Sequence, residues 1–371
     1  MGVLALAIAL ALILGFAAHR ASICTVRAVA ELMSSRGGFM FASIGRSVLW
    51  VWAVTIPLFW LTPAAGTGLI GWSLTGFAVL GGFLFGLGAA LNGACAYNTM
   101  ARLVDGDGRM LATITGFALG VVCFAVLERG RWLPRPVPAP AMISSLLAWA
   151  MMPALAVLSW ALCEAVRLWR TRPPDTRLVD LVLAPRYRLS TAALLIGLPG
   201  ALLFHLFGSF GYTATYELVI EGAMGTRPWP IMIRWVILLA ILTGMFLSTW
   251  QRGSFRVDWR PRMAWLMNLG GGALMGVGTA LAHGGNDALV LYGIPILSPY
   301  ALPTFAALAL GAAAGLLAMR RWFGIEARVV CRNDTFIADS WTRPFEPRPD
   351  RAACEKRNRK TGKNGPSLAM N

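Results

Sequence analysis

Charged residues are scarce in this chain. They make up 13% of its 371 residues, whereas soluble domains carry roughly 25%. Hydrophobic residues reach 57%, and the windows 3–18, 74–91 and 231–249 contain at most one charged residue each. A helix needs about 20 predominantly apolar residues to cross a hydrocarbon core of about 30 Å. The composition therefore excludes a soluble globular domain. It predicts membrane-spanning helices, because lipid cannot satisfy the backbone hydrogen bonds of irregular chain.

Metal-binding patterns are absent as well. The chain has three histidines and six cysteines, and no pair of cysteines has CxxC spacing. This excludes the ligand patterns of structural zinc sites, and we expect neither a metal nor a cofactor. Cys123 and Cys163 lie inside apolar segments, where we expect them to fill small spaces in the core. Cys331 and Cys354 lie near the C-terminus, which we place in the reducing cytosol, so a structural disulfide is not expected.

Signatures of catalysis and of nucleic-acid binding are missing. The sequence contains no phosphate-binding loop, no dinucleotide fingerprint and no matched pair of nucleophile and base, so we do not expect an enzyme. The net charge of +16 could suggest a nucleic-acid partner. However, the arginines lie mostly between apolar segments, where they are typical of the loops of a multispan membrane protein. We therefore expect the lipid bilayer, and no nucleic acid, as the partner of this basic chain.

Hydropathy predicts an all-α membrane protein of about nine transmembrane helices. The predicted crossings lie near residues 3–18, 47–61, 74–91, 110–127, 141–168, 189–207, 231–249, 263–282 and 301–319. One set of alternate loops holds fifteen arginines and the other set holds four. Because the richer side faces the cytosol, the N-terminus is predicted outside and the C-terminus inside, in a bacterial inner membrane. Residues 1–320 form the predicted transmembrane domain, and the basic residues 321–371 a predicted disordered cytosolic tail.

An internal repeat is the most informative pattern. The segment GGFLFGLGAALNGACAYN, which begins at Gly81, matches GGALMGVGTALAHGGNDA, which begins at Gly271, without a gap and with seven identities in the first eleven positions. The predicted topology runs the two copies in opposite directions. This indicates an inverted-topology repeat with halves at about 1–168 and 189–320, as in many secondary transporters. A duplication that serves helix packing alone is the alternative, because small residues are common where membrane helices meet.

Polar interruptions follow both copies. The sequences NGACAYN and AHGGND break the apolar runs after Leu91 and Leu281, and RASICTVRAV at 20–29 is a third interruption. Broken helices are tolerated at membrane depth only where they are buried in protein or line a polar cavity. We therefore expect re-entrant or broken half-helices, with the functional residues placed at the breaks.

The candidate site residues come from these interruptions. Cys24 and Cys95 are candidate ligand-binding thiols, with small buried residues as the alternative. His283 and Asp287 are four residues apart and on a helix would share a face, where they could pair. Asp287 could instead cap the helix that follows it. An ionisable residue within the membrane is a functional candidate by default. The further permeation candidates are Asn92, Gly285 and Asn286.

The motifs RASICTV, GLGAALNGACAYNTMAR and GGALMGVGTALAHGGND…GIP, in this order and spacing, resemble the YeeE/YedE sulfur-transport family over roughly residues 1–320. The resemblance implies uptake of thiosulfate or a related sulfur anion, which cysteines in loop constrictions pass along by S–H···S hydrogen bonds. It assigns the first two family cysteines to Cys24 and Cys95. The third family cysteine is replaced by Gly285. We expect His283 and Asn286, which can donate hydrogen bonds, to replace the missing thiol.

Three hypotheses follow from the sequence. The first is a transporter of a small sulfur-containing anion, for which a cytosolic sulfur carrier is a candidate partner. The second is a membrane-bound sulfur-transfer protein that carries a persulfide on Cys24 or Cys95. The third is a non-transporting subunit that docks a partner through its C-terminal tail. A persulfide carrier requires an exposed, reactive thiol, and both cysteines lie in or beside apolar segments, which favours transport.

Overall fold

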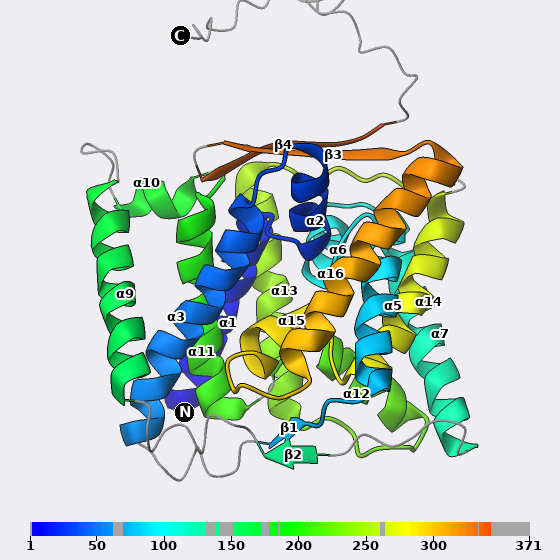
Figure 1. The fold of residues 1–371 in the computed structure, drawn as a ribbon, viewed down its shortest axis with the longest axis horizontal. Helices are drawn as coiled ribbons and strands as arrows, with labels where there is room; N and C mark the ends of the chain where they lie inside the picture. The colour runs from blue at the N-terminus through cyan, green and yellow to red at the C-terminus, as the bar shows by residue number, and fades with distance from the viewer. Residues whose placement is uncertain are drawn as a thin grey trace, which may run out of the picture.

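The computed structural model describes residues 2–61, 70–130, 138–140, 151–171, 178–184, 186–208, 210–259, 264–332 and 334–342. Long helices occur in all nine predicted segments. They are α1 (Gly2–Ala21), α3 (Phe39–Leu61), α5 (Gly76–Asn92), α7 (Arg109–Arg129), α9 (Met151–Arg170), α11 (Leu189–Phe207), α13 (Met232–Arg252), α14 (Ala264–Ala282) and α16 (Ala301–Ala318). In the described part of the chain, seven helical stretches are long and apolar enough to cross a membrane. The protein is therefore a mostly helical, multi-pass membrane protein (Figure 1).

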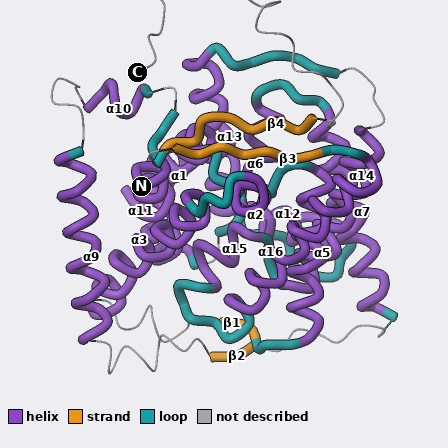
Figure 2. The backbone as a smooth tube through the Cα atoms, turned by 45° about the horizontal axis from the view of Figure 1, so that its top comes forward, coloured by secondary structure: helices purple, strands orange, loops and turns teal. Residues whose placement is uncertain are grey.

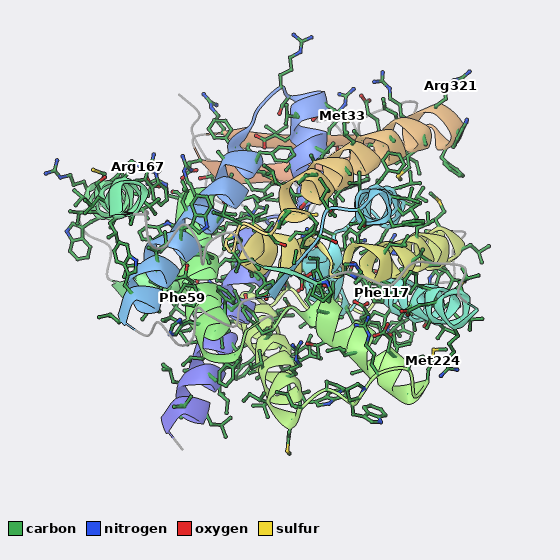
Figure 3. All side chains as sticks on the ribbon, turned by 60° about the horizontal axis from the view of Figure 1, so that its bottom comes forward. Met33, Phe59, Phe117, Arg167, Met224 and Arg321 are labelled. Atoms are coloured by element: carbon green, nitrogen blue, oxygen red, sulfur yellow. The ribbon has the colours of Figure 1, made fainter. Side chains whose placement is uncertain are left out.

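The outer faces of these helices are apolar. Leu119, Leu266 and Leu310 lie on three different long helices and are each more than half exposed. Arg167 and Arg321, by contrast, project from the edges of the molecule (Figure 3). Apolar side chains that would be costly in water are favourable against lipid, so these faces fit contact with the bilayer.

Four short helices follow breaks in the long ones. They are α2 (Thr25–Ser34), α6 (Ala96–Val104), α12 (Tyr212–Ala223) and α15 (Asn286–Ala288), which continues as a turn of π-helix at Leu289–Gly293. The local sequence explains the break after α5. That helix begins after Thr75, whose hydroxyl accepts a hydrogen bond from the amide of Ala78, and it ends at Gly93 with a φ of 69°. Glycine adopts this left-handed conformation at little cost. The three predicted interruptions all coincide with breaks, and the break between α11 and α12 was not predicted.

Glycines bring the two repeated segments into contact. α14 lies between α5 and α7, and α16 packs on α5. A Cβ at Gly81 would meet the backbone of Gly278, and a Cβ at Gly88 would meet that of Gly271, so α5 and α14 run antiparallel. Similarly, Gly82 faces the carbonyl of Thr304 in α16. Only glycine allows backbones to approach this closely.

Two small antiparallel sheets lie at opposite ends of the helices (Figures 1 and 2). One pairs β1 (Ile70–Trp72) with β2 (Pro138–Pro140), and the other pairs β3 (Glu326–Arg332) with β4 (Thr335–Thr342). The N-terminus of α1 lies toward the β1–β2 end (Figure 1). A short helix, α10 (Leu178–Leu183), lies toward the other end.

The β3–β4 hairpin corrects the predicted boundary of the disordered tail. The strands β3 and β4 are ordered because the hairpin packs on α2, with Val329 fully buried and Asp339 in an ion pair of 2.8 Å with Arg27. The basic charge of the segment predicts disorder, but charge takes no account of the contacts that β3 makes with α2. The expected disorder at 343–371 lies outside the described residues.

Candidate functional site

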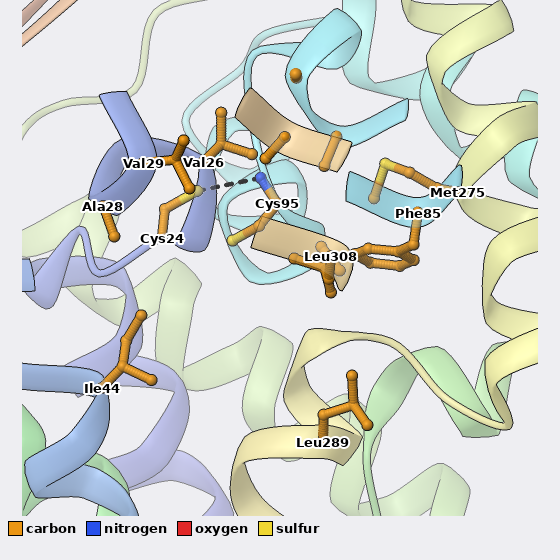
Figure 4. Close-up of a cluster of buried hydrophobic side chains, with 14 of the residues drawn as sticks. Cys24, Val26, Ala28, Val29, Ile44, Phe85, Cys95, Met275, Leu289 and Leu308 are labelled. Atoms are coloured by element: carbon orange, nitrogen blue, oxygen red, sulfur yellow. Dashed lines mark hydrogen bonds between the residues drawn. The ribbon is translucent and has the colours of Figure 1, made fainter. Parts of the chain in front are cut away.

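Cys24 and Cys95 meet at the start of two short helices. Cys24 is the N-cap of α2 and Cys95 the N-cap of α6, and neither side chain caps its own helix. The backbone N–H of Cys95 donates to the Sγ of Cys24 at 3.2 Å (Figure 4). Each residue is 1% exposed. The first N–H groups of a helix lack intrahelical partners and carry partial positive charge. The two thiols are therefore held where two helix ends favour an anion.

Cys123 and Cys163 lie away from this pair, on the outer faces of long helices. Cys123 on α7 and Cys163 on α9 are exposed rather than buried, so the expectation that they fill the core was wrong. The sequence placed them in the correct apolar helices but could not say which face of each helix points outward. They therefore serve as controls for the buried pair.

A second pair of helix starts lies beside the thiol pair in the fold. Gly211 and Gly285 are the N-caps of α12 and α15. The N–H of Gly285 donates to the Thr213 hydroxyl at 3.0 Å, and this hydroxyl donates to the Asp287 carboxylate at 2.5 Å. A hydroxyl and a carboxylate thus lie together at the starts of the second pair of helices, whose N-caps carry no side chain. A Cβ added at Gly285 would lie 2.8 Å from Cγ2 of Thr213, so the space that the missing third cysteine would need is filled.

A small cavity, called the central cavity below, touches one member of each pair, Cys24 and Asp287. It has a volume of about 50 Å³, enough to hold water, and its lining includes Cys24, Tyr97, Asn286 and Asp287. The rings of Tyr97 on α6 and Tyr212 on α12 lie 5.2 Å apart in a T-shaped arrangement. Among the described residues, the hydroxyls of both tyrosines and Oδ1 of Asn286 are buried without a hydrogen-bond partner. Buried polar groups in native proteins almost always have partners, so these atoms point to a polar occupant of the site.

His283 and Asp287 do not form the predicted pair. Residues 283–285 are not helical, and His283 has a φ of 55°, so the i, i+4 geometry of a helix does not apply. The imidazole packs instead 4.7 Å from the Trp72 ring and 6.5 Å from the Tyr300 ring. The carboxylate of Asp287 binds Thr213 of α12, and it also accepts from the backbone N–H of Ala288 in its own short helix, so the alternative that it caps this helix stays a prediction.

Asn92 braces the break between α5 and α6. Its amide donates to the carbonyl of Ala94 at 3.0 Å and to the Thr99 hydroxyl at 2.8 Å, and its Oδ1 accepts from Thr113 at 2.6 Å. These bonds replace the backbone partners that the broken helix lacks. Asn92 also lines a larger cavity at the β3–β4 end of the molecule.

Basic cavities lie on either side of the breaks. The inner vestibule, named here for the cavity at the β3–β4 end, has a volume of about 510 Å³ and includes Arg27, Arg102 and Arg109 in its lining. The outer vestibule, at the β1–β2 end, has a volume of about 550 Å³ and includes Arg129 and Arg227. Each lining also holds one carboxylate, Asp339 in the inner vestibule and Glu128 in the outer one, so arginines outnumber carboxylates in both. Both cavities are wide enough for small hydrated anions, and this excess of positive charge would attract them.

The turn between α6 and α7 anchors the inner vestibule. Asp107 forms ion pairs with Arg102 at 2.7 Å and with Arg109 at 2.9 Å. Burial acts to raise the pKa of Asp107, but hydrogen bonds from Arg109 and the positive charge of Arg102 outweigh it and lower this pKa below its ordinary value. Asp105 accepts hydrogen bonds from Thr249 and Ser254. The LVDGDGR segment, residues 103–109, is therefore a turn held by side-chain contacts.

Sequence reasoning missed Thr213, Tyr97 and Tyr212. For Thr213 and Tyr212 the available signal was the interruption GSFGYT, which follows the apolar run 189–207 and contains two glycines. It resembles the other three breaks, but it holds no cysteine and no charge. For that reason it drew no attention as a site. Tyr97 lies in the interruption NGACAYN, where the cysteine was singled out instead.

Comparison with known proteins agrees with the motif resemblance. The family described as Sulphur transport matches residues 20–314, which is most of the chain and includes all four breaks. The chain is also similar to the thiosulfate transporter TsuA of Escherichia coli strain K12. The two are 24% identical over 298 residues, which cover 73% of this chain and 82% of that protein. The β3–β4 hairpin lies beyond the matched residues.

Proposed function

This chain belongs to the sulphur transport family, and we propose that it carries thiosulfate or a related small sulfur-containing anion across the bacterial inner membrane. The observation that carries the proposal is the contact between Cys24 and Cys95 at the starts of α2 and α6. Two buried thiols beside two helix N-termini, between two basic vestibules, suit a polarizable anion. The E. coli relative that transports thiosulfate supports the same substrate class.

Because a thiol is a weak hydrogen-bond donor, it can bind an anion during transport without retaining it. An S–H group is a poorer hydrogen-bond donor than a hydroxyl or an ammonium. Conduction requires a site that is favourable enough to enter and weak enough to leave. The thiols must stay protonated to donate, whereas a persulfide carrier must expose a reactive thiolate. The near-complete burial of both thiols therefore favours transport over sulfur transfer.

Matched contacts support an inverted-topology repeat. Gly82 of α5 faces the carbonyl of Thr304, and its counterpart Gly272 of α14 faces the carbonyl of Thr113. In the same way α1 packs on α13, and α3 packs on α11. Each half would then contribute two of the four short helices. In this arrangement Cys24 and Cys95 belong to the first half, and Thr213 and Asp287 to the second.

The route that we propose joins the two vestibules through the breaks. An anion would enter at Arg129 and Arg227, pass the central cavity and the thiol pair, and leave beside Arg27 and Arg102. Asn286 lines the central cavity with an unpartnered carbonyl oxygen, and its amide offers donors to an oxyanion. His283 lies against Trp72, which lines the outer vestibule, so we assign it to the entrance rather than to the position of the third thiol.

Radioactive uptake tests the proposal directly. Proteoliposomes that contain the purified protein should accumulate ³⁵S-thiosulfate faster than empty liposomes, and unlabelled thiosulfate should compete. Sulfate should compete weakly, because it has no terminal sulfur to accept from a thiol. If labelled thiosulfate enters no faster than in empty liposomes, while sulfate or another oxyanion does, the thiosulfate assignment is wrong.

Reporter fusions test the proposed orientation. Fusions at residues 173 and 347 should report the cytosol, and a fusion at residue 226, beside the outer vestibule, should report the periplasm. The expectation follows from the excess of arginine at the β3–β4 end, since cytosolic loops are enriched in basic residues. A periplasmic signal at 173 or 347 would reverse the assignment of the two vestibules.

A further inference from the structure

Asp287 is a buried carboxylate in the proposed anion path. It is 2% exposed, and it lines the central cavity together with Cys24. The Thr213 hydroxyl and backbone N–H both donate to its two oxygens. A Cβ at Gly211 would lie 2.9 Å from Oδ2, so α12 packs closely against the carboxylate. Because Asp287 shares this cavity with Cys24, its charge affects any anion that binds at the thiols.

No positive charge among the described residues faces this carboxylate. The groups that face it, or that share its cavity, are the phenols of Tyr97 on α6 and Tyr212 on α12, the Thr213 hydroxyl, the thiol of Cys24 before α2, Ser47 on α3 and the amide of Asn286. Cys95 lies near the same two phenols. His283, on the same segment as Asp287, packs on Trp72. All of these groups are neutral in their ordinary protonation states.

An ionised Asp287 would oppose the anion. Two like charges that share a small, poorly hydrated cavity repel strongly, because little water screens them. Entry of an anion therefore requires the carboxylate to be neutral. The required change is the binding of one proton to a carboxylate oxygen.

We propose that Asp287 is the proton-carrying residue that couples anion passage to proton movement, so that the protein is a proton–anion symporter. This inference rests on the proposed function. Asp287 takes one proton from the outer aqueous phase as the anion reaches the thiol pair. It returns that proton to the cytosol once the anion has left, and its ionised form is then held by the two donors of Thr213. The only bonds that change are O–H bonds: one breaks in a hydrated proton outside as one forms on Asp287, and the reverse exchange with water occurs on the cytosolic side.

Transport under an imposed pH gradient tests this coupling. In proteoliposomes with the membrane potential clamped by potassium and valinomycin, wild-type ³⁵S-thiosulfate uptake should rise by up to about tenfold when the outside is one pH unit more acidic, since proton activity changes tenfold. Adding thiosulfate to weakly buffered vesicles whose membrane potential is clamped in the same way should also make the outer medium more alkaline, because the clamp removes the potential that would otherwise draw protons in by leak. This second measurement uses only the wild-type protein, so it does not depend on whether a variant folds.

The decisive variant is Asp287→Asn. The amide oxygen still accepts from Thr213, but the residue carries neither charge nor a transferable proton. Uptake by this variant should continue down the anion gradient and should no longer respond to the pH gradient. The matched control is Glu217→Gln, which neutralises another buried carboxylate, one helical turn beyond Thr213 on α12. This control should keep the full response.

The outcomes separate the two proposals. Wild-type uptake that ignores the pH gradient and moves no protons overturns the coupling and leaves the transport function intact. A full response in Asp287→Asn, or its loss in Glu217→Gln alone, overturns the assignment to Asp287. Absence of wild-type uptake at every gradient overturns the proposed function, and the coupling with it.

Discussion

Replacing Cys24 or Cys95 by alanine should reduce thiosulfate uptake by at least about tenfold, which corresponds to the loss of roughly 1.4 kcal/mol of stabilisation along the path. The reason is that alanine removes the only polar atom of the side chain. In Cys24→Ala it also removes the acceptor for the backbone N–H of Cys95, which is buried. The measurement is initial-rate ³⁵S-thiosulfate uptake, normalised to the amount of monodisperse protein.

The controls for this result are the two exposed cysteines. Cys123→Ala and Cys163→Ala change helices of the same protein but lie on outer faces, so both should transport at close to the wild-type rate. Cys24→Ser and Cys95→Ser keep a donor of similar size but a harder one. We expect them to take up thiosulfate more slowly than the wild type, and sulfate or sulfite should inhibit their remaining uptake more strongly. Equal losses in all four alanine variants would mean that the buried pair serves packing alone.

Replacing Gly276 by alanine should destabilise the protein by about 3 kcal/mol or more, at or above the upper end of the usual cost of overpacking. A Cβ at this position would collide with the carbonyl of Phe117 on α7, and backbone atoms cannot move aside as a flexible side chain can. α14 would have to separate from α7 and from the break that follows it. The measurement is the thermal unfolding midpoint in detergent, together with the yield of monodisperse protein.

Gly270 on the same helix is the matched control. It is exposed, and a Cβ there meets nothing within 4 Å. Gly270→Ala should therefore be neutral or stabilise the helix by about 0.5–1 kcal/mol, because alanine loses less conformational entropy than glycine. Equal unfolding midpoints for the two variants would contradict the close packing of α14 on α7.

Much of the helical framework could be predicted from the sequence, because membrane helices are defined by local composition. Each of the nine apolar segments is helical over nearly all of its described residues, and the polar interruptions after Leu91 and Leu281 coincide with breaks. The positions of Cys24 and Cys95 at helix starts follow from the same local signal. The number of membrane crossings and their direction stay predictions, since neither is a local property of the fold.

The central site was only partly predictable. That Cys24 and Cys95, 71 residues apart, lie within a hydrogen bond of each other depends on how α2 and α6 pack. The prediction of a His283–Asp287 pair assumed a continuous helix, which the left-handed His283 interrupts. Thr213 escaped notice because a threonine in an apolar segment is unremarkable until a carboxylate is placed beside it.

The sequence by itself determined that the chain is a multi-pass membrane protein with broken helices, because hydropathy and interruptions act over a few neighbouring residues. It also carried the motifs that place the chain in its family. Only the tertiary structure decided which polar groups share a cavity, that Asp287 binds Thr213 rather than His283, and that β3 and β4 form a hairpin over α2. These features depend on contacts between segments up to 312 residues apart, such as Arg27 with Asp339, and no local pattern encodes such a contact.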